Sequence, residues 1–433
     1  MEDYKFEDII RVVKRENNKN RKFLFLNLLQ GKYVPCNPRK TLELFETLGK
    51  KLAKKYEGMQ VCLIGFAETA TAIAATVASC FNQQVYFLHT TREEMEKKYL
   101  VTEFQEEHSH AKKHCLYCKE KEWLKKSDVL ILVDDEFTTG KTVCNLIKNL
   151  REKQWLKKDC KIVAASLINC MNEEHLQRFK KEKIECEYLI HRKDDWEKID
   201  WNGFDFREDE EEKLALKKSD CENLREKKRN VEYDTRKWSL EDEKKDNQNV
   251  CGNKQRLQNS EIVMIEKEMV PLNKGARADI IKIKGRKNPR MGVFQLEYQN
   301  ACEKLAVDMI EKLRIEEKKT EEILLLGTEE YMYPVIYAAD KIQAMYPEKH
   351  CYVHATSRSP IVAFRQETYP IYSREEVVSF YEKDRNVFLY NLRKYDCVIV
   401  LTDAENKMED AAYSMERVMK KYGNDNWRLV QWV

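Results

Sequence analysis

The 433-residue sequence lacks several features that would assign it to large classes of protein. It has no apolar run long enough to span a membrane, and residues 1–20 are charged and contain no apolar signal core. Its net charge is only +3, because 78 basic residues nearly balance 75 acidic ones, and this gives no field for wrapping nucleic acid. We therefore expect a cytoplasmic protein with no membrane or nucleic-acid partner.

The length and composition predict two globular domains. A chain of 433 residues exceeds what one core usually supports, and 42% of its residues are hydrophobic. The fourteen cysteines are scattered along the chain instead of clustering as in a small secreted disulfide scaffold. This distribution is typical of a reduced compartment.

The first predicted domain, residues 1–206, alternates short apolar runs with helical patterns, which indicates a mostly parallel α/β sheet. Apolar runs such as 129–133 are continuous, as expected of strands covered by helices on both faces. We predict strands at 60–64, 84–89, 128–133 and 161–169, and helices at 68–80 and 141–151.

A charged connector and a second α/β domain are predicted to follow. Residues 207–260 are dense in charge and poor in aliphatic side chains, so they can bury little. Alternation resumes in residues 261–433. We predict strands at 322–326, 350–355, 397–401 and 427–433, and helices at 331–345 and 408–421.

Three landmarks recur in the same order in both domains. Gly65 and Gly327 each end an apolar run, and each is followed three residues later by a glutamate, Glu68 or Glu330. The matched segments are 61–68 with 323–330, 86–92 with 352–358, and 129–135 with 397–403. We interpret the second domain as a degenerate repeat of the first, the alternative being chance similarity between common α/β units.

The strongest local signal is the segment 129–142, in which a buried strand leads through a hydroxyl-rich turn into a helix. Asp134 and Asp135 follow the apolar run and can accept hydrogen bonds from a ribose diol. The turn that opens the helix suits a phosphate monoester, because a helix start offers backbone amides and glycine allows close approach. Its predicted phosphate ligands are Thr138, Thr139, Gly140, Lys141 and Thr142.

The end of this segment also resembles the tail of a nucleoside-triphosphatase P-loop. That motif requires a glycine five residues before Gly140, where this chain has Asp135. A carboxylate at that position would repel a triphosphate, so the P-loop interpretation fails.

Segment 129–142 is similar to the phosphoribosyl pyrophosphate signature of type I phosphoribosyltransferases. The resemblance implies a pyrophosphate loop after an earlier strand, and segment 65–71 lies in the corresponding place. The residues of this predicted loop are Gly65, Phe66, Ala67, Glu68, Thr69, Ala70 and Thr71. The resemblance also implies Mg²⁺, bound through the substrate with Asp134 and Asp135.

Type I enzymes carry a mobile hood between these two elements, and residues 90–114 are similarly placed. Arg92, His108 and His110 would neutralise pyrophosphate or move a proton there. One alternative is a solvated loop. The other is a zinc site with ligands from His110, His114, Cys115 and Cys118, although no second Cys-x-x-Cys pair accompanies it.

Three motifs together resemble one branch, the phosphoribosyltransferase of bacterial tellurite-resistance and stress gene clusters: segments 65–70, 106–111 and 134–140. In that family an orotate phosphoribosyltransferase-like domain precedes a domain named for a Thr-Arg-Ser-Pro motif. Segment 356–360 matches this motif with one inserted serine. The predicted C-terminal site residues are Glu330, Arg358, Ser359 and Asp403.

The resemblance implies displacement of pyrophosphate from phosphoribosyl pyrophosphate by an unidentified nitrogenous base, in the synthesis of a nucleoside-like metabolite. The alternatives are a regulator that only senses the nucleotide, and a hydrolase that uses the same pocket. The second domain could supply the acceptor pocket, a second active site or the surface of a homodimer. It has no Thr-Thr-Gly turn after Asp403.

Overall fold

The computed structural model describes both predicted α/β domains within one compact unit. The described residues are 4–16, 23–104, 114–192, 280–316, 321–366, 368–405 and 408–433. His108, His110 and the predicted connector 207–260 lie outside them, so the predicted domain boundaries stay predictions. No helix of the described segments has the length and apolar character needed to cross a membrane.

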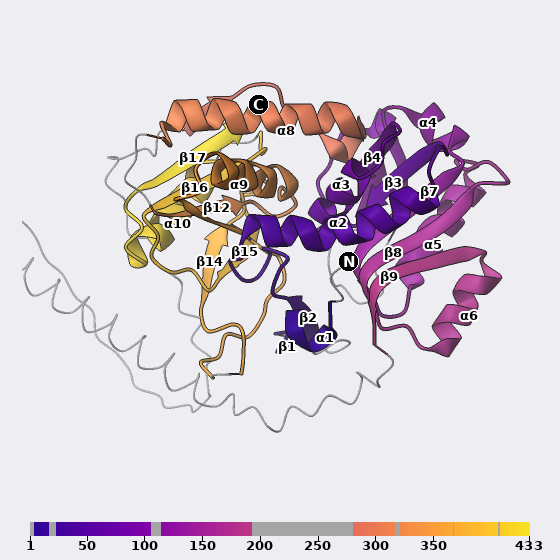
Figure 1. The fold of residues 1–433 in the computed structure, drawn as a ribbon, viewed down its shortest axis with the longest axis horizontal. Coiled ribbons are helices and arrows are strands. Elements are labelled where there is room, and N and C mark those ends of the chain that lie inside the picture. The colour runs from indigo at the N-terminus through magenta and orange to yellow at the C-terminus, as the bar shows by residue number, and fades with distance from the viewer. Residues whose placement is uncertain are drawn as a thin grey trace, which may run out of the picture. The chain divides into compact units, whose positions relative to one another are not determined.

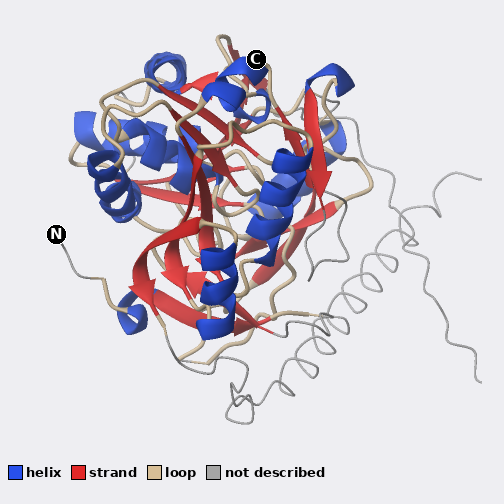
Figure 2. Cartoon of the chain, turned by 90° about the vertical axis from the view of Figure 1, so that its right-hand side faces the viewer, coloured by secondary structure: helices blue, strands red, loops and turns tan. Residues whose placement is uncertain are grey.

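Six strands form the first sheet: β3 (Val61–Gly65), β4 (Val85–His89), β7 (Val129–Phe137), β8 (Lys161–Asn169), β9 (Ile184–His191) and β11 (Val293–Phe294). Their order is β11-β4-β3-β7-β8-β9, and all neighbours are parallel except β11 and β4. The first domain's longer helices are α2 (Pro38–Lys55), α3 (Thr71–Ser79), α5 (Lys141–Glu152) and α6 (Glu173–Lys181). Helices lie on both sides of strands in Figure 2, which explains why β3 and β4 are buried throughout.

Five strands form the second sheet: β10 (Ile280–Ile283), β12 (Glu322–Gly327), β13 (His350–Ala355), β16 (Cys397–Thr402) and β17 (Trp427–Trp432). Their order is β10-β17-β16-β12-β13, and every neighbouring pair is parallel. The accompanying helices are α8 (Gln295–Leu313), α9 (Tyr333–Met345) and α10 (Glu409–Lys421). The second domain is therefore also α/β, as predicted.

Shorter elements complete the described fold. Two antiparallel pairs, β1 with β2 and β14 with β15, contribute a hairpin to the N-terminal segment and one to the C-terminal domain, and β5 pairs with β6 beside β4. The bounds are α1 (Phe6–Ile9), β1 (Ile10–Lys14), β2 (Phe23–Asn27), η1 (Lys97–Tyr99), β5 (Leu100–Phe104), β6 (His114–Tyr117), α4 (Lys121–Lys126), η4 (Pro289–Met291), β14 (Arg374–Val378) and β15 (Asn386–Tyr390).

The two sheets share one strand order. β4-β3-β7-β8-β9 of the first corresponds to β13-β12-β16-β17-β10 of the second, with all these strands parallel. The register also agrees: Gly65 pairs with His89 and Val133, and Gly327 pairs with Ala355 and Leu401. The fifth strand comes from a different end of each domain. β9 is the last strand of the first domain along the chain, whereas β10 is the first strand of the second. A shared order and register support the interpretation of an internal repeat.

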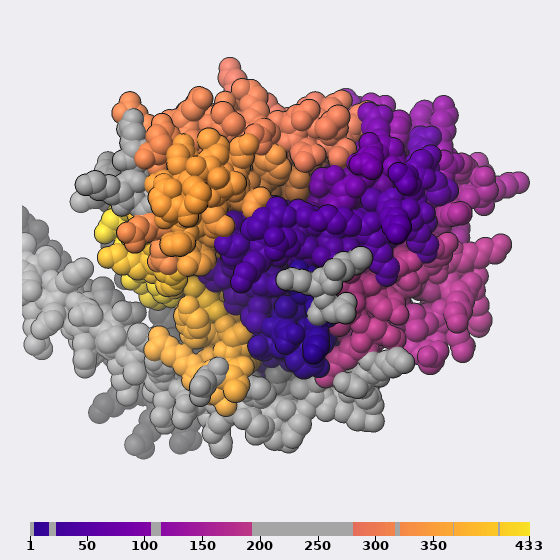
Figure 3. Space-filling model, viewed as in Figure 1, coloured from indigo at the N-terminus to yellow at the C-terminus, as the bar shows by residue number. Residues whose placement is uncertain are grey.

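The two domains contact each other in a reciprocal way. Val293, just before α8, pairs with Phe87 of β4, and Cys36, just before α2, pairs with Val353 of β13. Each domain thus adds a short antiparallel segment to the edge of the other domain's sheet. Helix contacts repeat the pattern, because α2 packs on α9 and α3 packs on α8. Figure 1 shows α2 running between the two sheets, and Figure 3 shows it between residues of both domains.

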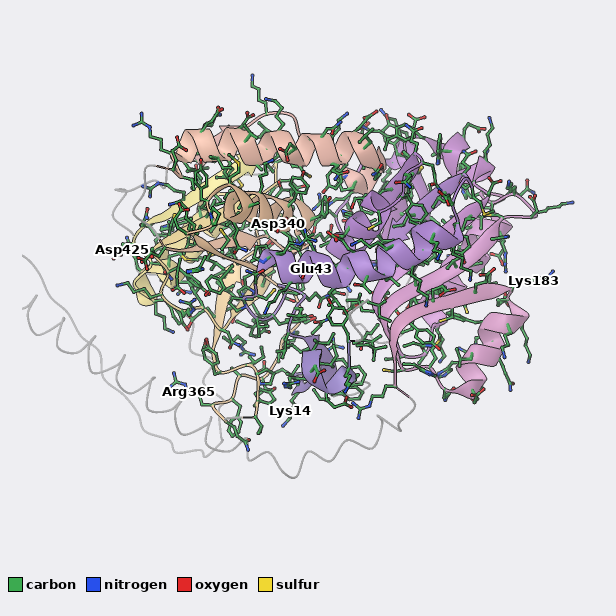
Figure 4. All side chains as sticks on the ribbon, in the orientation of Figure 1. Lys14, Glu43, Lys183, Asp340, Arg365 and Asp425 are labelled. Carbon is green, nitrogen blue, oxygen red and sulfur yellow. The ribbon has the colours of Figure 1, made fainter. Side chains whose placement is uncertain are left out.

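A polar contact joins the same helices at the surface. Arg39 of α2 lies 3.5 Å from the Asp340 carboxylate of α9 and 3.1 Å from Glu43. Glu43 and Asp340 lie next to each other in Figure 4. An exposed ion pair of this kind contributes at most about 1 kcal/mol to stability. The apolar and buried contacts therefore provide most of the stability of the interface between the domains.

The sequence patterns located the central elements well. The strands predicted at 161–169 and 350–355 match β8 and β13 at both ends. Two predicted bounds were wrong by three or more residues, since the strand predicted at 128–133 continues to Phe137 and the helix predicted at 68–80 begins only at Thr71. Asp134 and Asp135 therefore lie within β7, where Asp134 pairs with Ser166 of β8.

We predict a stability component that depends on one buried histidine. His354 donates through Nε2 to the Tyr390 carbonyl at 2.7 Å, and burial lowers its pKa from 6.5 to about 4. Between these values the unfolded chain binds a proton that the folded chain does not, so stability falls as the pH decreases from 6.5 toward 4. This position should contribute up to about 3 kcal/mol of that loss.

Urea unfolding measured from pH 7 to pH 4.5 tests this expectation. His354→Gln should lose less stability on acidification than the native chain, whatever its stability at pH 7. His350→Gln is the matched control, because His350 lies on the same strand but is exposed. Identical pH dependence in both variants would contradict the prediction.

Candidate active site

The ends of three neighbouring strands bring the predicted site segments together. Because β3, β4 and β7 are parallel, their carboxyl ends lie at one edge of the first sheet. The Thr69 hydroxyl donates to Asp135 Oδ1 at 2.9 Å, and the Phe66 amide donates to the Val133 carbonyl at 2.9 Å. The segment predicted to hold pyrophosphate therefore adjoins the acids predicted to hold the ribose.

The predicted phosphate turn has the geometry of an open helix start. Gly140 has a φ of +67° and forms the N-cap of α5 without a side-chain capping hydrogen bond. An added Cβ at Gly140 would lie 2.4 Å from the Phe179 ring, so the turn packs directly on α6. The Lys141 amide lies 3.4 Å from Thr139 Oγ1. The first amides of a helix have no partner within the helix, and the positive helix end favours an anion.

The two acids of β7 differ in their partners. Both Asp134 and Asp135 are half-buried. The Asp135 amide donates to Asp134 Oδ1 at 2.9 Å, and the Asp135 carboxylate accepts from Thr69. Adjacent carboxylates at a strand end are suitable acceptors for a diol, and their oxygens are the hard ligands that Mg²⁺ prefers.

The loop 65–71 is anchored from several sides. The Ala67 amide donates to Thr90 Oγ1 at 2.9 Å, and the peptide bond between Ala67 and Glu68 is cis. The Thr71 hydroxyl donates to the Glu330 carbonyl at 2.9 Å, so it contacts the C-terminal domain. The Glu68 carboxylate also turns toward that domain. Because the Thr71 and Glu68 side chains contact the C-terminal domain, the backbone of this loop is better placed than they are to bind an anion.

Glu68 belongs to a buried cluster of charges that joins the domains. Lys32 is fully buried, and its Nζ lies 2.5 Å from Glu68 Oε1 and donates to the carbonyls of Glu329 and Thr356 at 2.7 and 2.8 Å. Burial lowers the pKa of the Lys32 ammonium. Burial alone would raise the pKa of Glu68, but Lys32 and Arg358 hold it below its usual value. The carboxylate is therefore ionised and neutralised locally.

A second buried cluster surrounds Asp403, the counterpart of Asp135 in the strand register. Arg290 forms ion pairs with Glu330 at 2.9 Å and with Asp403 at 2.5 Å. The Tyr381 hydroxyl donates to Asp403 Oδ1 at 2.6 Å. Although burial opposes ionisation, Arg290 keeps the pKa of both carboxyl groups below the usual range. Glu330 and Asp403 are thus occupied by protein partners.

Arg92 lies near the predicted hood but makes its described contacts inside the protein. Its Nε donates to His114 Nε2 at 3.0 Å, and its amide donates to Glu330 Oε1 at 3.3 Å. His114 is buried beside Thr90, whose hydroxyl lies 3.4 Å from His114 Nδ1. Arg92 is therefore adjacent to the loop 65–71, whereas His108 and His110 lie outside the described residues.

Several residues of these clusters carry no sequence signal. Lys32, Arg290 and Tyr381 stand in no motif, and each acquires its role only through contacts with distant parts of the chain. The repeat offered one indirect clue, since Arg358 occupies the position that corresponds to Arg92. Ser359 was predicted as a residue of the C-terminal site, and its carbonyl accepts from the Tyr390 hydroxyl at 2.5 Å.

One cavity of the described structure lies away from the phosphate turn. It has a volume of about 670 Å³ and is bordered by both domains. Its lining residues are Tyr86, Glu94, Met95, Glu96, Lys119, Glu120, Arg286, Lys287, Asn288, Met291, Gly292, Val293, Phe294, Glu297 and Glu405. None of these residues belongs to segments 65–71 or 134–142. This cavity therefore gives no support for the candidate site, which we assign from the positions of the strand ends.

The zinc alternative finds no support within the described residues. No cluster of three or more histidine, cysteine or acidic side chains suited to a metal occurs in the described ranges. Cys118 is buried, with its Sγ 3.9 Å from the Tyr86 hydroxyl. His110 lies outside those ranges.

Comparison with known families gives a match in each half of the chain. Residues 9–193 match a family described as phosphoribosyl transferase, and residues 287–419 match the TRSP domain found C-terminal to it. The chain belongs to this two-domain phosphoribosyltransferase family. The predicted type I fold and the predicted Thr-Arg-Ser-Pro domain are confirmed, and Arg358 and Ser359 lie in the part that matches the TRSP domain.

The phosphoribosyltransferase domain is similar to solved structures at low identity. Adenine phosphoribosyltransferase from Rhodothermus marinus is 13% identical with a TM-score of 0.32, covering 43% of this chain and 96% of its own. The Trypanosoma brucei enzyme, solved with AMP, pyrophosphate and ribose-5-phosphate, is 9% identical with a TM-score of 0.32, covering 48% and 90%. A Bacillus anthracis hypoxanthine-guanine phosphoribosyltransferase is 13% identical with a TM-score of 0.23, covering 38% and 82%. No curated protein matches the chain.

We predict that Gly140→Ala is much more damaging than a matched glycine substitution elsewhere. Gly58 has a similar φ of +74°, but an added Cβ there meets nothing within 4 Å. Gly58→Ala should therefore cost only the backbone strain of about 1 kcal/mol, whereas Gly140→Ala adds a clash with Phe179 and should cost about 3 kcal/mol.

Urea unfolding of both variants gives these free energies, and calorimetry with ribose 5-phosphate gives the binding. Gly140→Ala should weaken binding at least tenfold and Gly58→Ala should leave it unchanged. Equal losses of stability and equal affinities in the two variants would show that the turn is not closely packed.

Proposed function

We propose that the chain transfers ribose 5-phosphate from phosphoribosyl pyrophosphate to a nitrogenous base and releases pyrophosphate. The observation that supports this most is the contact between Thr69 and Asp135, which joins the loop 65–71 to the acids of β7. Membership of the phosphoribosyltransferase family supports the same donor. By resemblance to its branch, we further propose that the product is a nucleoside-like metabolite linked to stress or tellurite resistance.

The phosphate turn would hold the donor at its 5′ end. Amides at the start of α5, with the hydroxyls of Thr138, Thr139 and Thr142, would donate to the phosphate oxygens. Lys141 adds a positive charge next to them. Asp134 and Asp135 would accept from the ribose hydroxyls, so the sugar lies across the end of β7 with its anomeric carbon toward the loop 65–71.

In the transfer step, a nitrogen lone pair of the base forms a bond to the anomeric carbon while the carbon–oxygen bond to pyrophosphate breaks. The transition state has cationic character on the sugar, which the Asp134 and Asp135 carboxylates would stabilise electrostatically. Arg92, with His108 and His110 of the predicted hood, would neutralise pyrophosphate or accept the proton that the base loses. Closure of that hood would exclude water that could capture the cation.

The acids of β7 are suitable for Mg²⁺. Asp134 and Asp135 are consecutive acids near the end of β7, where the Asp135 carboxylate accepts from the Thr69 hydroxyl and the Asp134 carboxylate accepts from the Asp135 amide. Mg²⁺ bound together with the substrate would neutralise the charge that develops on the leaving pyrophosphate. Both carboxylates would then serve the metal-bound substrate as well as the diol.

We predict that Asp134→Asn combined with Asp135→Asn lowers turnover at least about a hundredfold, because the neutral amides no longer stabilise the cationic sugar. Pyrophosphate release from phosphoribosyl pyrophosphate in the presence of Mg²⁺ and cell extract measures turnover, and mass spectrometry identifies the ribosylated product. Asp425→Asn is the control, since Asp425 is an exposed acid of the C-terminal domain, at the left of Figure 4.

The possible outcomes separate the candidate functions. Loss of pyrophosphate release only in the double variant supports the transferase. Release without any ribosylated product in the native chain would point to a hydrolase, and binding without release would point to a sensor. Unchanged release in the double variant would mean that these acids are not the catalytic residues.

A further inference from the structure

An arginine of the C-terminal domain contacts the loop that we assign to pyrophosphate. Arg358 follows β13 within the Thr-Arg-Ser-Pro-like segment, and its amide donates to Glu68 Oε1 at 3.4 Å. Its Nε lies 3.4 Å from Glu68 Oε2. Both side chains are only 10% exposed, so water screens the interaction weakly. Arg358 therefore acts on the centre of the loop 65–71 from the other domain.

Arg358 is itself held in a fixed position. Its Nε lies 2.5 Å from Glu329 Oε2, and its NH2 group lies 2.7 Å from Glu93 Oε1. Glu329 is fixed in turn by Ser379, whose hydroxyl donates to it at 2.5 Å. These contacts come from both domains and leave the guanidinium little freedom. A rigid cation is suited to hold a loop in one conformation.

The contact has a counterpart on the other side of the repeat. The amide of Arg92 donates to Glu330 Oε1 at 3.3 Å, just as the amide of Arg358 donates to Glu68 Oε1. The Ala67 amide bonds to Thr90 Oγ1, and the Glu329 amide bonds to Thr356 Oγ1 at 3.0 Å. The Arg92 and Arg358 contacts thus cross to the strand-end loop of the opposite domain, whereas the Ala67 and Glu329 contacts support each loop from within its own domain.

The strand ends of the two domains nevertheless differ in their acidic residues and in the partners of those residues. Asp135 is half-buried and accepts from a neutral hydroxyl, whereas its counterpart Asp403 is only 4% exposed and is occupied by Arg290 and Tyr381. Position 402 is a threonine, so the second acid is absent, and Thr402 accepts from the Thr328 hydroxyl at 2.9 Å. Protein side chains fill the place where a sugar would lie in the second domain.

We propose, resting on the transferase function above, that Arg358 is a positioning residue for pyrophosphate binding and that the C-terminal domain is a built-in support without a sugar-phosphate site. Arg358 and Lys32 neutralise Glu68, which would otherwise repel an anionic leaving group from within its own loop. Through the Glu68 side chain they also hold that loop in place. The phosphate turn 138–142 makes no described contact with Arg358, so its affinity is independent of this arginine.

Calorimetry with two ligands tests this division. The probes are inorganic pyrophosphate with Mg²⁺, which reports on the loop 65–71, and ribose 5-phosphate, which reports on the turn 138–142. Arg358→Gln should weaken pyrophosphate binding at least tenfold and change ribose 5-phosphate binding less than twofold. Arg358→Lys keeps the buried charge, so it should fold as the native chain does, and it should show an intermediate loss for pyrophosphate alone.

Arg393→Gln is the matched control, because Arg393 pairs with Glu322 elsewhere in the same domain, and both affinities should stay native. If Arg358→Lys and Arg358→Gln bind pyrophosphate like the native chain, the positioning role is wrong while the proposed function stands. Equal weakening of both ligands would show a general structural role and also overturn it. If the native chain binds neither ligand, the proposed function itself fails.

Discussion

The buried charges between the two domains constrain the rest of the structure. Lys32 has three partners within 2.8 Å and no access to water, and two of these partners belong to the C-terminal domain. Glu68 is shared between Lys32 and Arg358, and Glu330 is shared between Arg290 and the first domain's Thr91. Removing one member of such a cluster leaves another charge buried without a partner, which costs about 3–5 kcal/mol. The domains are therefore coupled at the strand ends where the candidate site lies.

The two coupled domains share one strand order and register but differ in their chemistry. Shared strand order and register bring Glu68 and Glu330 to equivalent places, and the exchange of short edge segments brings each toward the other domain. In the first half the strand β7 carries two acids near its end and is followed by a glycine turn that opens a helix. In the second half Arg290 fills the equivalent space. Within the described residues, the features of the candidate site thus occur in the first half, and an ion pair of Arg290 occupies the equivalent place in the second.

Much of this arrangement could be predicted from sequence, because local patterns determine it. The acids of β7, the turn at Gly140 and the repeat of Gly65 and Gly327 are all visible as short motifs, and parallel strands bring such motifs to one edge. The bounds of β7 were less predictable, since pairing with β8 extends the strand through polar residues. The buried cluster could not be predicted: Lys32 resembles any surface lysine until a contact almost 300 residues away, with Glu329, encloses it.

The central claim is that one half of the repeat binds the sugar-phosphate donor and the other half supports it. Isothermal titration of the native chain with phosphoribosyl pyrophosphate and Mg²⁺ tests this most directly, because it counts the sites per chain. The account predicts one site for each chain. Two equivalent sites would contradict it by showing that the C-terminal domain also binds the donor, and no binding would contradict the assignment of the strand-end site in the first domain.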